Sequence, residues 1–152
     1  MTVHIGFTGS REGTTEAQKQ NLVDMFYADA NEPVVFHHGD CLGADNDAHL
    51  LFLKTFDVMG TQHKIVIHPP KSPDKRAFCA HIPTLNMEVV ELPVKDYLAR
   101  DRDIVEASEL LLATPKEDSE RWKGGTWYTV HYAKKKFVDS VILWPDGGIE
   151  YG

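Results

Sequence analysis

Short apolar segments alternate with amphipathic stretches along almost the whole chain, and this alternation limits the possible folds more than any other feature. The apolar segments have the length and residue types of strands, and they cover residues 3–8, 34–38, 64–68, 87–92, 109–115 and 141–144. Helical patterns cover residues 15–30, 44–56, 95–107 and 124–136. Parallel strands need crossover connections and are covered on both faces. We therefore predict an α/β fold, a Rossmann-like three-layer sandwich with a mainly parallel sheet that ends at residues 141–144.

The length and charge of the chain narrow its function classes. A chain of 152 residues fits one domain, residues 1–152. Its 16 Lys and Arg against 23 Asp and Glu give a net charge of −7, which argues against nucleic acid as the main partner. Apolar runs such as residues 50–53 are far shorter than the roughly 20 residues that span a bilayer, so we expect no membrane association. The two cysteines, Cys41 and Cys79, favour a cytoplasmic protein over a disulfide scaffold.

The turn after the first strand is a candidate phosphate contact. In parallel sheets, ligands bind at the carboxyl ends of strands, near the point where the strand order reverses. The turn contains Gly9, Ser10 and Arg11. Glycine lets a ligand approach the backbone, and the two side chains can donate hydrogen bonds to a phosphate. The alternative interpretation is a simple glycine turn with an exposed arginine.

The turn after the second strand is a second candidate. The residues that we single out there are Gly39, Asp40, Gly43, Ala44 and Asp45. The start of the following helix favours an anion. The two aspartates would repel a bare phosphate, so we expect at least one of them to contact a ribose hydroxyl or a base edge. Asp45 alternatively caps the helix.

Histidines near this turn raise the question of a metal ion. Neighbouring strand residues point to opposite faces, so His37 and His38 are not expected to bind one ion, and we predict no metal and no cofactor. Asp45 and His49 are expected to pair on one helix face. Cys41 is either a nucleophile or, more commonly for such a residue, a buried small thiol.

Two further segments carry residues suited to an anionic ligand. Arg100 and Arg102 lie on a helix, where either belongs to a solvated face or places its guanidinium at the mouth of a site. Gly124, Gly125 and Thr126 open another helix and provide unpaired amides, a positive dipole end and a hydroxyl, which predicts phosphate binding. Nearby, Trp122 and Trp127 are candidates for base stacking, for the core or for a dimer contact.

Taken in order, these segments resemble the SLOG superfamily of Rossmann-like proteins, which includes the Lonely-guy phosphoribohydrolases, the DprA/Smf family and short YspA-like proteins. The resemblance spans nearly the whole chain and lies in residues 9–11, in Gly39 with residues 43–45 and Ala48, in Arg100 with Arg102, and in residues 124–126. It implies a site for a nucleotide-derived ligand, with phosphate at residues 124–126, and often a homodimer.

One position departs from the Lonely-guy pattern. Those enzymes have a glutamate three residues after the threonine of the last motif, whereas this chain has Thr129 there. Cleavage of an N-glycosidic bond passes through an oxocarbenium-like state that a carboxylate stabilises and a threonine does not. A different carboxylate would have to replace it, and the candidates are Glu12, Asp40, Asp45 and Asp103.

These observations leave three functional hypotheses. The first is a module that binds a nucleotide or a phosphoribosyl-containing small molecule at the carboxyl edge of the sheet, as a sensor, carrier or sequestering protein. The second is an enzyme that hydrolyses or transfers at the N-glycosidic bond of a nucleoside monophosphate. The third, single-stranded DNA binding, is disfavoured by the charge of −7. In the first two cases the proline-rich residues 69–86, with Lys71, Lys75, Arg76 and His81, are a candidate lid over the ligand.

Overall fold

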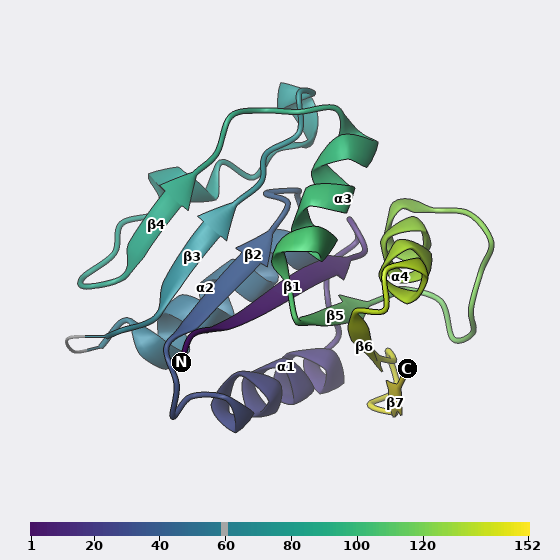
Figure 1. The fold of residues 1–152 in the computed structure, drawn as a ribbon, viewed down its shortest axis with the longest axis horizontal. Coiled ribbons are helices and arrows are strands. Elements are labelled where there is room, and N and C mark those ends of the chain that lie inside the picture. The colour runs from purple at the N-terminus through teal and green to yellow at the C-terminus, as the bar shows by residue number, and fades with distance from the viewer. Residues whose placement is uncertain (59–60) are drawn as a thin grey trace.

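The computed structural model describes residues 1–58 and 61–152, and within them the strands form one seven-stranded sheet (Figure 1). The spatial order is β4-β3-β2-β1-β5-β6-β7. In chain order the strands are β1 (Val3–Gly9), β2 (Val34–His38), β3 (Lys64–Ile67), β4 (Glu88–Glu91), β5 (Leu110–Thr114), β6 (Asp139–Leu143) and β7 (Ile149–Tyr151). Only β6 and β7 pair antiparallel among these strands. The predicted fold class, a mainly parallel α/β sandwich, is confirmed.

Helices cover both faces of the sheet. The helices are α1 (Glu16–Ala28), α2 (Ala44–Phe56), α3 (Tyr97–Ala107) and α4 (Gly125–Lys135). One hydrophobic core joins α1 and α2 to the sheet, and a second core joins α3 and α4 to the opposite face (Figure 1). Alternation along β5 divides the two cores, because Leu112 packs in the first while Leu111 and Ala113 pack in the second.

The start of α1 is fixed by its sequence. Thr15 accepts a hydrogen bond from the Gln18 amide, and the Gln18 side chain accepts one from the Thr15 amide, which completes a capping box. Buried Gln18 also donates to the carbonyl of Pro115, just after β5, and to that of Leu143, the last residue of β6. Gln18 therefore ties the start of α1 to the carboxyl edge of the sheet.

The strand order reverses at β1. Strand β1 pairs with β2 on one side and with β5 on the other, so the chain builds outward to β4 and then crosses back through α3. The loops that follow β1 and β5 diverge at this point, and such a divergence opens a crevice at the carboxyl edge of a parallel sheet. The topology therefore places residues 9–11 beside the most favourable position for a ligand.

The sheet extends further than the sequence predicts. The expected last strand, residues 141–144, is β6 over Asp139–Leu143, and β7 continues the sheet beyond it. A turn connects them, in which the Gly147 amide donates to the Trp144 carbonyl and the Trp144 amide to that of Gly148. Strand β7 has three exposed residues and no buried apolar face, so it leaves no strand pattern in the sequence.

None of the helices in the described residues has both the length and the apolar character that crossing a bilayer requires.

Candidate functional site

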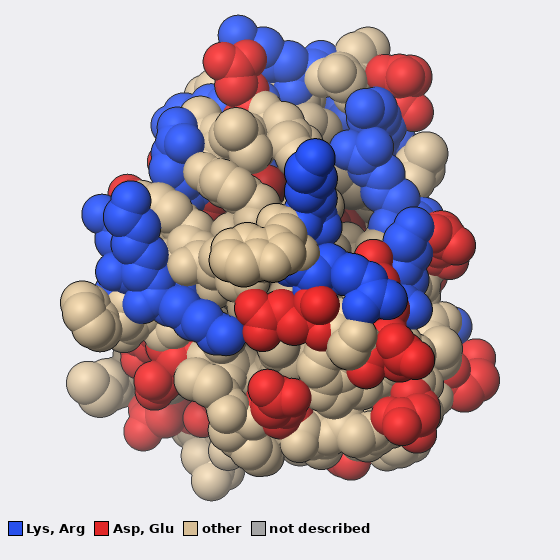
Figure 2. Space-filling view, turned by 90° about the vertical axis from the view of Figure 1, so that its right-hand side faces the viewer, with Lys and Arg blue, Asp and Glu red and all other residues tan. Residues whose placement is uncertain are grey.

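A cavity of about 570 Å³ opens at the carboxyl edge of the sheet, at the strand reversal. Its walls come from the loops after β1, β2, β3 and β5, from α3 and from the start of α4. Among the lining residues are the cations Arg11, Lys71, Lys75 and Lys116. On the face seen in Figure 2, Lys and Arg side chains gather mainly in the upper half and most Asp and Glu side chains in the lower half. The lining also contains the acidic residues Glu12, Asp45, Asp96, Asp101 and Glu117, so basic and acidic side chains are balanced in it, whereas the whole chain has a net charge of −7.

The turns after β1 and β2 are locked together. The Ala44 amide donates a 2.9 Å hydrogen bond to the Ser10 carbonyl. Gly43 has φ of +87°, and a β-carbon there would overlap the backbone of Arg11. Neither Gly43 nor Ala44 lines the cavity. They act on it indirectly, since they hold Ser10 and Arg11 in position.

Tyr97 links the first turn to the start of α4. Its ring lies under the guanidinium of Arg11, 5.5 Å from the ring centroid, and its hydroxyl lies against Gly125. Residues 9–11 and 124–126 line the same cavity, although more than 100 residues separate them in the sequence. The two tripeptides therefore both lie next to Tyr97 in one cavity.

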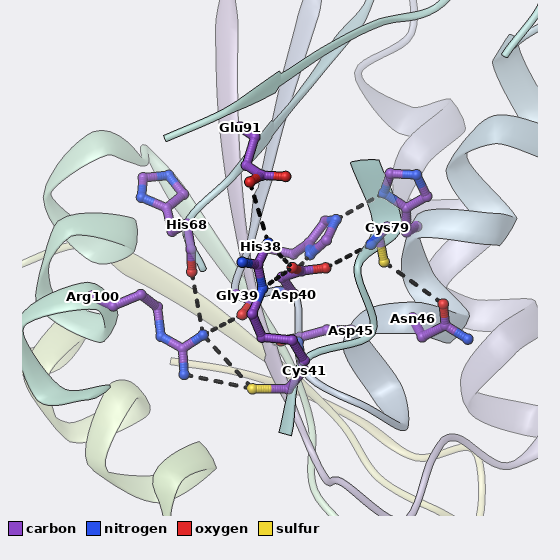
Figure 3. A network of polar contacts seen from close by, with 12 residues as sticks. His38, Gly39, Asp40, Cys41, Asp45, Asn46, His68, Cys79, Glu91 and Arg100 are labelled. Carbon is purple, nitrogen blue, oxygen red and sulfur yellow. Dashed lines mark hydrogen bonds and ion pairs between the residues drawn. The ribbon is translucent and has the colours of Figure 1, made fainter. Parts of the chain in front are cut away.

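Arg100 forms the floor of the cavity and is 3% exposed. Its Nη1 donates to the carbonyls of Gly39 and His68, and both Nη atoms lie within 3.7 Å of the Cys41 Sγ (Figure 3). A β-carbon at Gly39 would overlap the guanidinium, so only glycine allows this approach. Burial lowers the pKa of Arg100, but nearby Asp101 and other acceptors raise it by more, so the side chain stays charged.

Two buried carboxyl groups face Arg100 in the cavity wall. The Asp101 Oδ1 lies 2.8 Å from the Arg100 Nε, and the Asp45 Oδ2 accepts the amide hydrogen of Cys41 at 3.0 Å. Burial raises the pKa of Asp45 and of Asp101 to about 6, although the charge of Arg100 opposes this rise in both. The floor thus holds two carboxyl groups against one guanidinium.

Cys41 lies in this floor and is 8% exposed. Burial raises the pKa of its thiol, and the negative charge of Asp45 adds to the rise, although Arg100 opposes it. A raised pKa favours the thiol over the nucleophilic thiolate. The structure therefore favours the interpretation of Cys41 as a buried small side chain.

The structure divides the candidate residues into two groups. The residues that line the cavity are Gly9, Ser10, Arg11, Gly39, Asp45, Arg100, Gly124, Gly125 and Thr126. The residues that do not line it are Asp40, Gly43, Ala44 and Arg102. Arg102 points elsewhere and donates to the Tyr128 hydroxyl at 3.1 Å.

Asp40 is fully buried and holds the segment after β3 in place. Its carboxylate accepts hydrogen bonds from the Arg76 side chain and the Cys79 amide, both at 2.9 Å (Figure 3). Arg76 also pairs with Glu91 at 3.3 Å. The candidate lid, residues 69–86, is therefore anchored to the sheet at its centre, and only its first part, with Lys71 and Lys75, lines the cavity.

The histidines form hydrogen-bonded groups on opposite faces of the sheet. His37 contacts His4 and His68 at 2.9 Å each, whereas His38 contacts His49 at 2.8 Å. The ligand atoms of His38, His49 and Cys79 lie within 4.8 Å of one another.

A metal ion does not fit that last group well. The Nδ1 of His38 accepts the Asp40 amide hydrogen at 3.0 Å, so neutral His38 carries its proton on Nε2. That Nε2 then donates to the Nδ1 of His49. The His38 Nε2 and the His49 Nδ1, which would have to bind the ion, are therefore already hydrogen-bonded to each other. We assign no metal ion to His38, His49 and Cys79.

Sequence reasoning missed Asp101, Tyr97 and Lys116, which all line the cavity. A signal for the first two was present, because Tyr97, Arg100, Asp101 and Ile104 follow helical spacing and share one face of α3. Nothing in the sequence marks Lys116, since its position depends on the path of the loop after β5.

Comparison with known proteins establishes the fold. No family model matches the sequence, and no curated protein matches it either. Among solved structures, the chain is similar to the molybdenum cofactor binding protein of the phototrophic bacterium Rippkaea orientalis, with a TM-score of 0.64 and 18% identity over 95% of this chain and 77% of that one. It is also similar to DNA processing protein A of Helicobacter pylori, which binds single-stranded DNA, with a TM-score of 0.61 and 16% identity.

This second alignment covers 93% of the present chain and 65% of the Helicobacter pylori chain. At such identities the likeness establishes the architecture alone. DNA processing protein A belongs to one of the families that the sequence motifs resemble, so the resemblance and the fold agree at that level.

Proposed function

We propose that this chain is a SLOG-type module that binds a nucleotide or a phosphoribosyl-containing small molecule in the cavity at the carboxyl edge of the sheet. The observation that carries the proposal is the convergence of residues 9–11 and 124–126 on one cavity, with the Arg11 guanidinium among its lining side chains. A role as sensor, carrier or sequestering protein, a cytoplasmic location and assembly as a homodimer are parts of the same proposal.

The start of α4 is the proposed phosphate position. Gly124, the N-cap, has φ of +113° and makes no side-chain capping bond, so the first amides of the helix, at the cavity-lining residues Gly125 and Thr126, have no capping side chain. These amides and the helix dipole attract an anion. The Thr126 hydroxyl and the Arg11 guanidinium line the same space and add donors.

The size and polarity of the cavity fit the rest of such a ligand. A volume of about 570 Å³ lies within the usual range of small-molecule sites, roughly 300–1,000 Å³. The fold neighbours bind a cofactor in one case and single-stranded DNA in the other. We favour the small molecule because the chain carries a net charge of −7 and lacks the cationic excess that DNA binding uses.

Substitution of Arg11 and of Thr126 tests the phosphate position. Arg11→Ala and Thr126→Ala are each expected to weaken AMP binding by about 1–3 kcal/mol, because each removes a donor from a charged acceptor. Isothermal titration calorimetry measures the change. Thr126→Ser restores the hydroxyl and is expected to recover most of the affinity, and Arg121→Ala, an exposed arginine outside the cavity, serves as the matched control. Unchanged AMP binding in both alanine variants would rule out this phosphate position.

The enzyme alternative rests on the carboxyl groups that line the cavity, which include Asp101 and two of the sequence candidates, Glu12 and Asp45, whereas Asp40 and Asp103 do not line it. Thr129, which stands where Lonely-guy enzymes have glutamate, is buried and donates to the Gly125 carbonyl instead of facing the cavity. Release of free adenine from AMP on prolonged incubation would favour the enzyme, whereas stable binding without adenine release would favour the module.

A further inference from the structure

We infer that Tyr97 is a phosphate-binding residue of the cavity. Its hydroxyl donates a hydrogen bond to the phosphate of the ligand, and its ring holds the Arg11 guanidinium beside the same phosphate. The inference rests on the proposed function and extends it to a residue that the sequence motifs do not include. It concerns the phosphate part of the ligand alone, so a ligand without phosphate does not use the Tyr97 hydroxyl.

The position of the Tyr97 hydroxyl is the first observation. Tyr97 is the first residue of α3, is partly buried and lines the cavity. A β-carbon at Gly125 would overlap the hydroxyl oxygen, so this oxygen lies directly against the start of α4. Because Gly125 has no side chain, the hydroxyl comes close to the backbone at the proposed phosphate position.

The free state of this hydroxyl is the second observation. Within residues 1–58 and 61–152 it has no hydrogen-bond partner, and it is not among the fully buried polar atoms without one, so it keeps accessible surface. Burial raises the pKa of Tyr97, and the charge of Asp101 adds to the rise, although Arg11 and Arg100 oppose it. The phenol therefore keeps its proton at neutral pH and is available as a donor to an anion.

The Arg11 side chain beside the ring is the third observation. Its guanidinium carbon lies 5.5 Å from the centroid of the Tyr97 ring, and the side chain is exposed, with no ion pair in the described part of the chain. The Arg100 guanidinium carbon lies 5.2 Å from the same centroid, but Arg100 is engaged by the carbonyls of Gly39 and His68. Of the two cations at this ring, Arg11 is the one available to a ligand. The contact with the ring restrains its long side chain.

Tyr97→Phe provides the direct test, measured by calorimetry with AMP and with adenosine at pH 7.5. The substitution keeps the ring and removes only the hydroxyl. We expect the Kd for AMP to rise about tenfold and the Kd for adenosine to change by less than about twofold, because only AMP has the phosphate acceptor. Tyr128→Phe is the matched control, since the Tyr128 hydroxyl bonds Arg102 outside the cavity, and it is expected to leave both values unchanged.

Tyr97→Leu tests the role of the ring, because it removes the surface on which Arg11 lies. The loss of AMP affinity caused by Arg11→Ala is expected to be at least about threefold smaller in Tyr97→Leu protein than in the wild-type chain. An equal loss in both would show that the ring does not position Arg11.

A measurement on the wild-type chain covers the case in which the variants fail to fold. With tyrosine labelled by carbon-13, the Cζ resonance of Tyr97 is expected to shift on saturation with AMP and to stay in place with adenosine. The Cζ resonance of Tyr128 is expected to stay in place with both ligands.

Two outcomes would overturn the inference. An unchanged Kd for AMP in Tyr97→Phe, or a Tyr97 resonance that ignores AMP, would show that the hydroxyl makes no bond to the phosphate. Equal losses of AMP and adenosine affinity would show that Tyr97 only maintains the shape of the cavity. A wild-type chain that does not bind AMP would instead contradict the proposed function, which separates the two failures.

Discussion

Replacement of Arg100 by methionine is expected to lower the free energy of unfolding by about 3–5 kcal/mol at pH 7, since breaking a buried ion pair leaves its partners without compensation. Asp45 and Asp101 would remain buried in the floor of the cavity without the cation that now opposes the rise in their pKa. The carbonyls of Gly39 and His68 would lose a donor as well. Urea denaturation followed by circular dichroism measures the change.

Measurement at two pH values separates the part of this loss of stability that comes from the lost ion pair from the part that comes from lost packing. The pKa of both carboxyl groups is about 6 beside Arg100 and rises further without it, so at pH 5 they are mostly protonated in both chains and the uncompensated charge largely disappears. The loss caused by Arg100→Met should therefore be smaller at pH 5 than at pH 7. Arg102→Met, on the same helix but bonded only to the Tyr128 hydroxyl, should cost less than about 1 kcal/mol at either pH. Equal losses for the two variants would contradict the assignment of Arg100 as the floor of the site.

The stability of the wild-type chain is expected to fall steeply between pH 6 and pH 5. Burial lowers the pKa of five histidines, to about 3 for His37, to about 4 for His49 and His68, well below the usual value for His38, and below the usual value for His63. A histidine with a lowered pKa in the folded state is protonated first in the unfolded chain, so acid favours unfolding. Asp45 and Asp101 act in the opposite sense, because their raised pKa makes the folded chain bind protons first.

The histidines dominate this balance. Near pH 5.5 the unfolded chain binds roughly four protons on the histidines and the folded chain roughly two on the carboxyl groups, so the free energy of unfolding should fall by about 3 kcal/mol per pH unit. Urea titrations at pH 6.0, 5.5 and 5.0 measure this slope. His68→Gln should reduce it by about 1.4 kcal/mol per pH unit, the contribution of one proton. A stability that stays constant or rises as the pH falls would show that these histidines are not buried in neutral form.

The architecture follows from the sequence because its signal is local and repeated. Apolar segments at residues 3–8, 34–38 and 109–115 lie close to β1, β2 and β5, and the glycine turns after the first two lie at the reversal of strand order. Strand β7 escapes prediction because it consists of three exposed residues and depends on pairing with β6. Hydrophobic periodicity does not report such a strand.

The candidate site follows from the sequence only where the backbone itself forms it. The tripeptides 9–11 and 124–126 are recognisable because glycine at a strand-to-helix turn has few other uses. The role of a side chain depends on partners that are distant in the sequence. Asp40 resembles a ligand contact in the sequence, but its carboxylate accepts hydrogen bonds from Arg76 and from the Cys79 amide. Conversely, Asp101 is unremarkable in a charged stretch until the structure shows its carboxyl group buried against Arg100 in the lining of the cavity.

Backbone amide chemical shifts, followed by NMR during titration with AMP, test the central claim most directly. The account predicts that the largest shifts occur at the amides of Ser10, Arg11, Gly125 and Thr126, because these residues line the cavity where the phosphate is expected. Residues at the opposite edge of the sheet, such as those of the turn before β2, should not move. Saturable shifts confined to a different surface would contradict a ligand site at the carboxyl edge of the sheet.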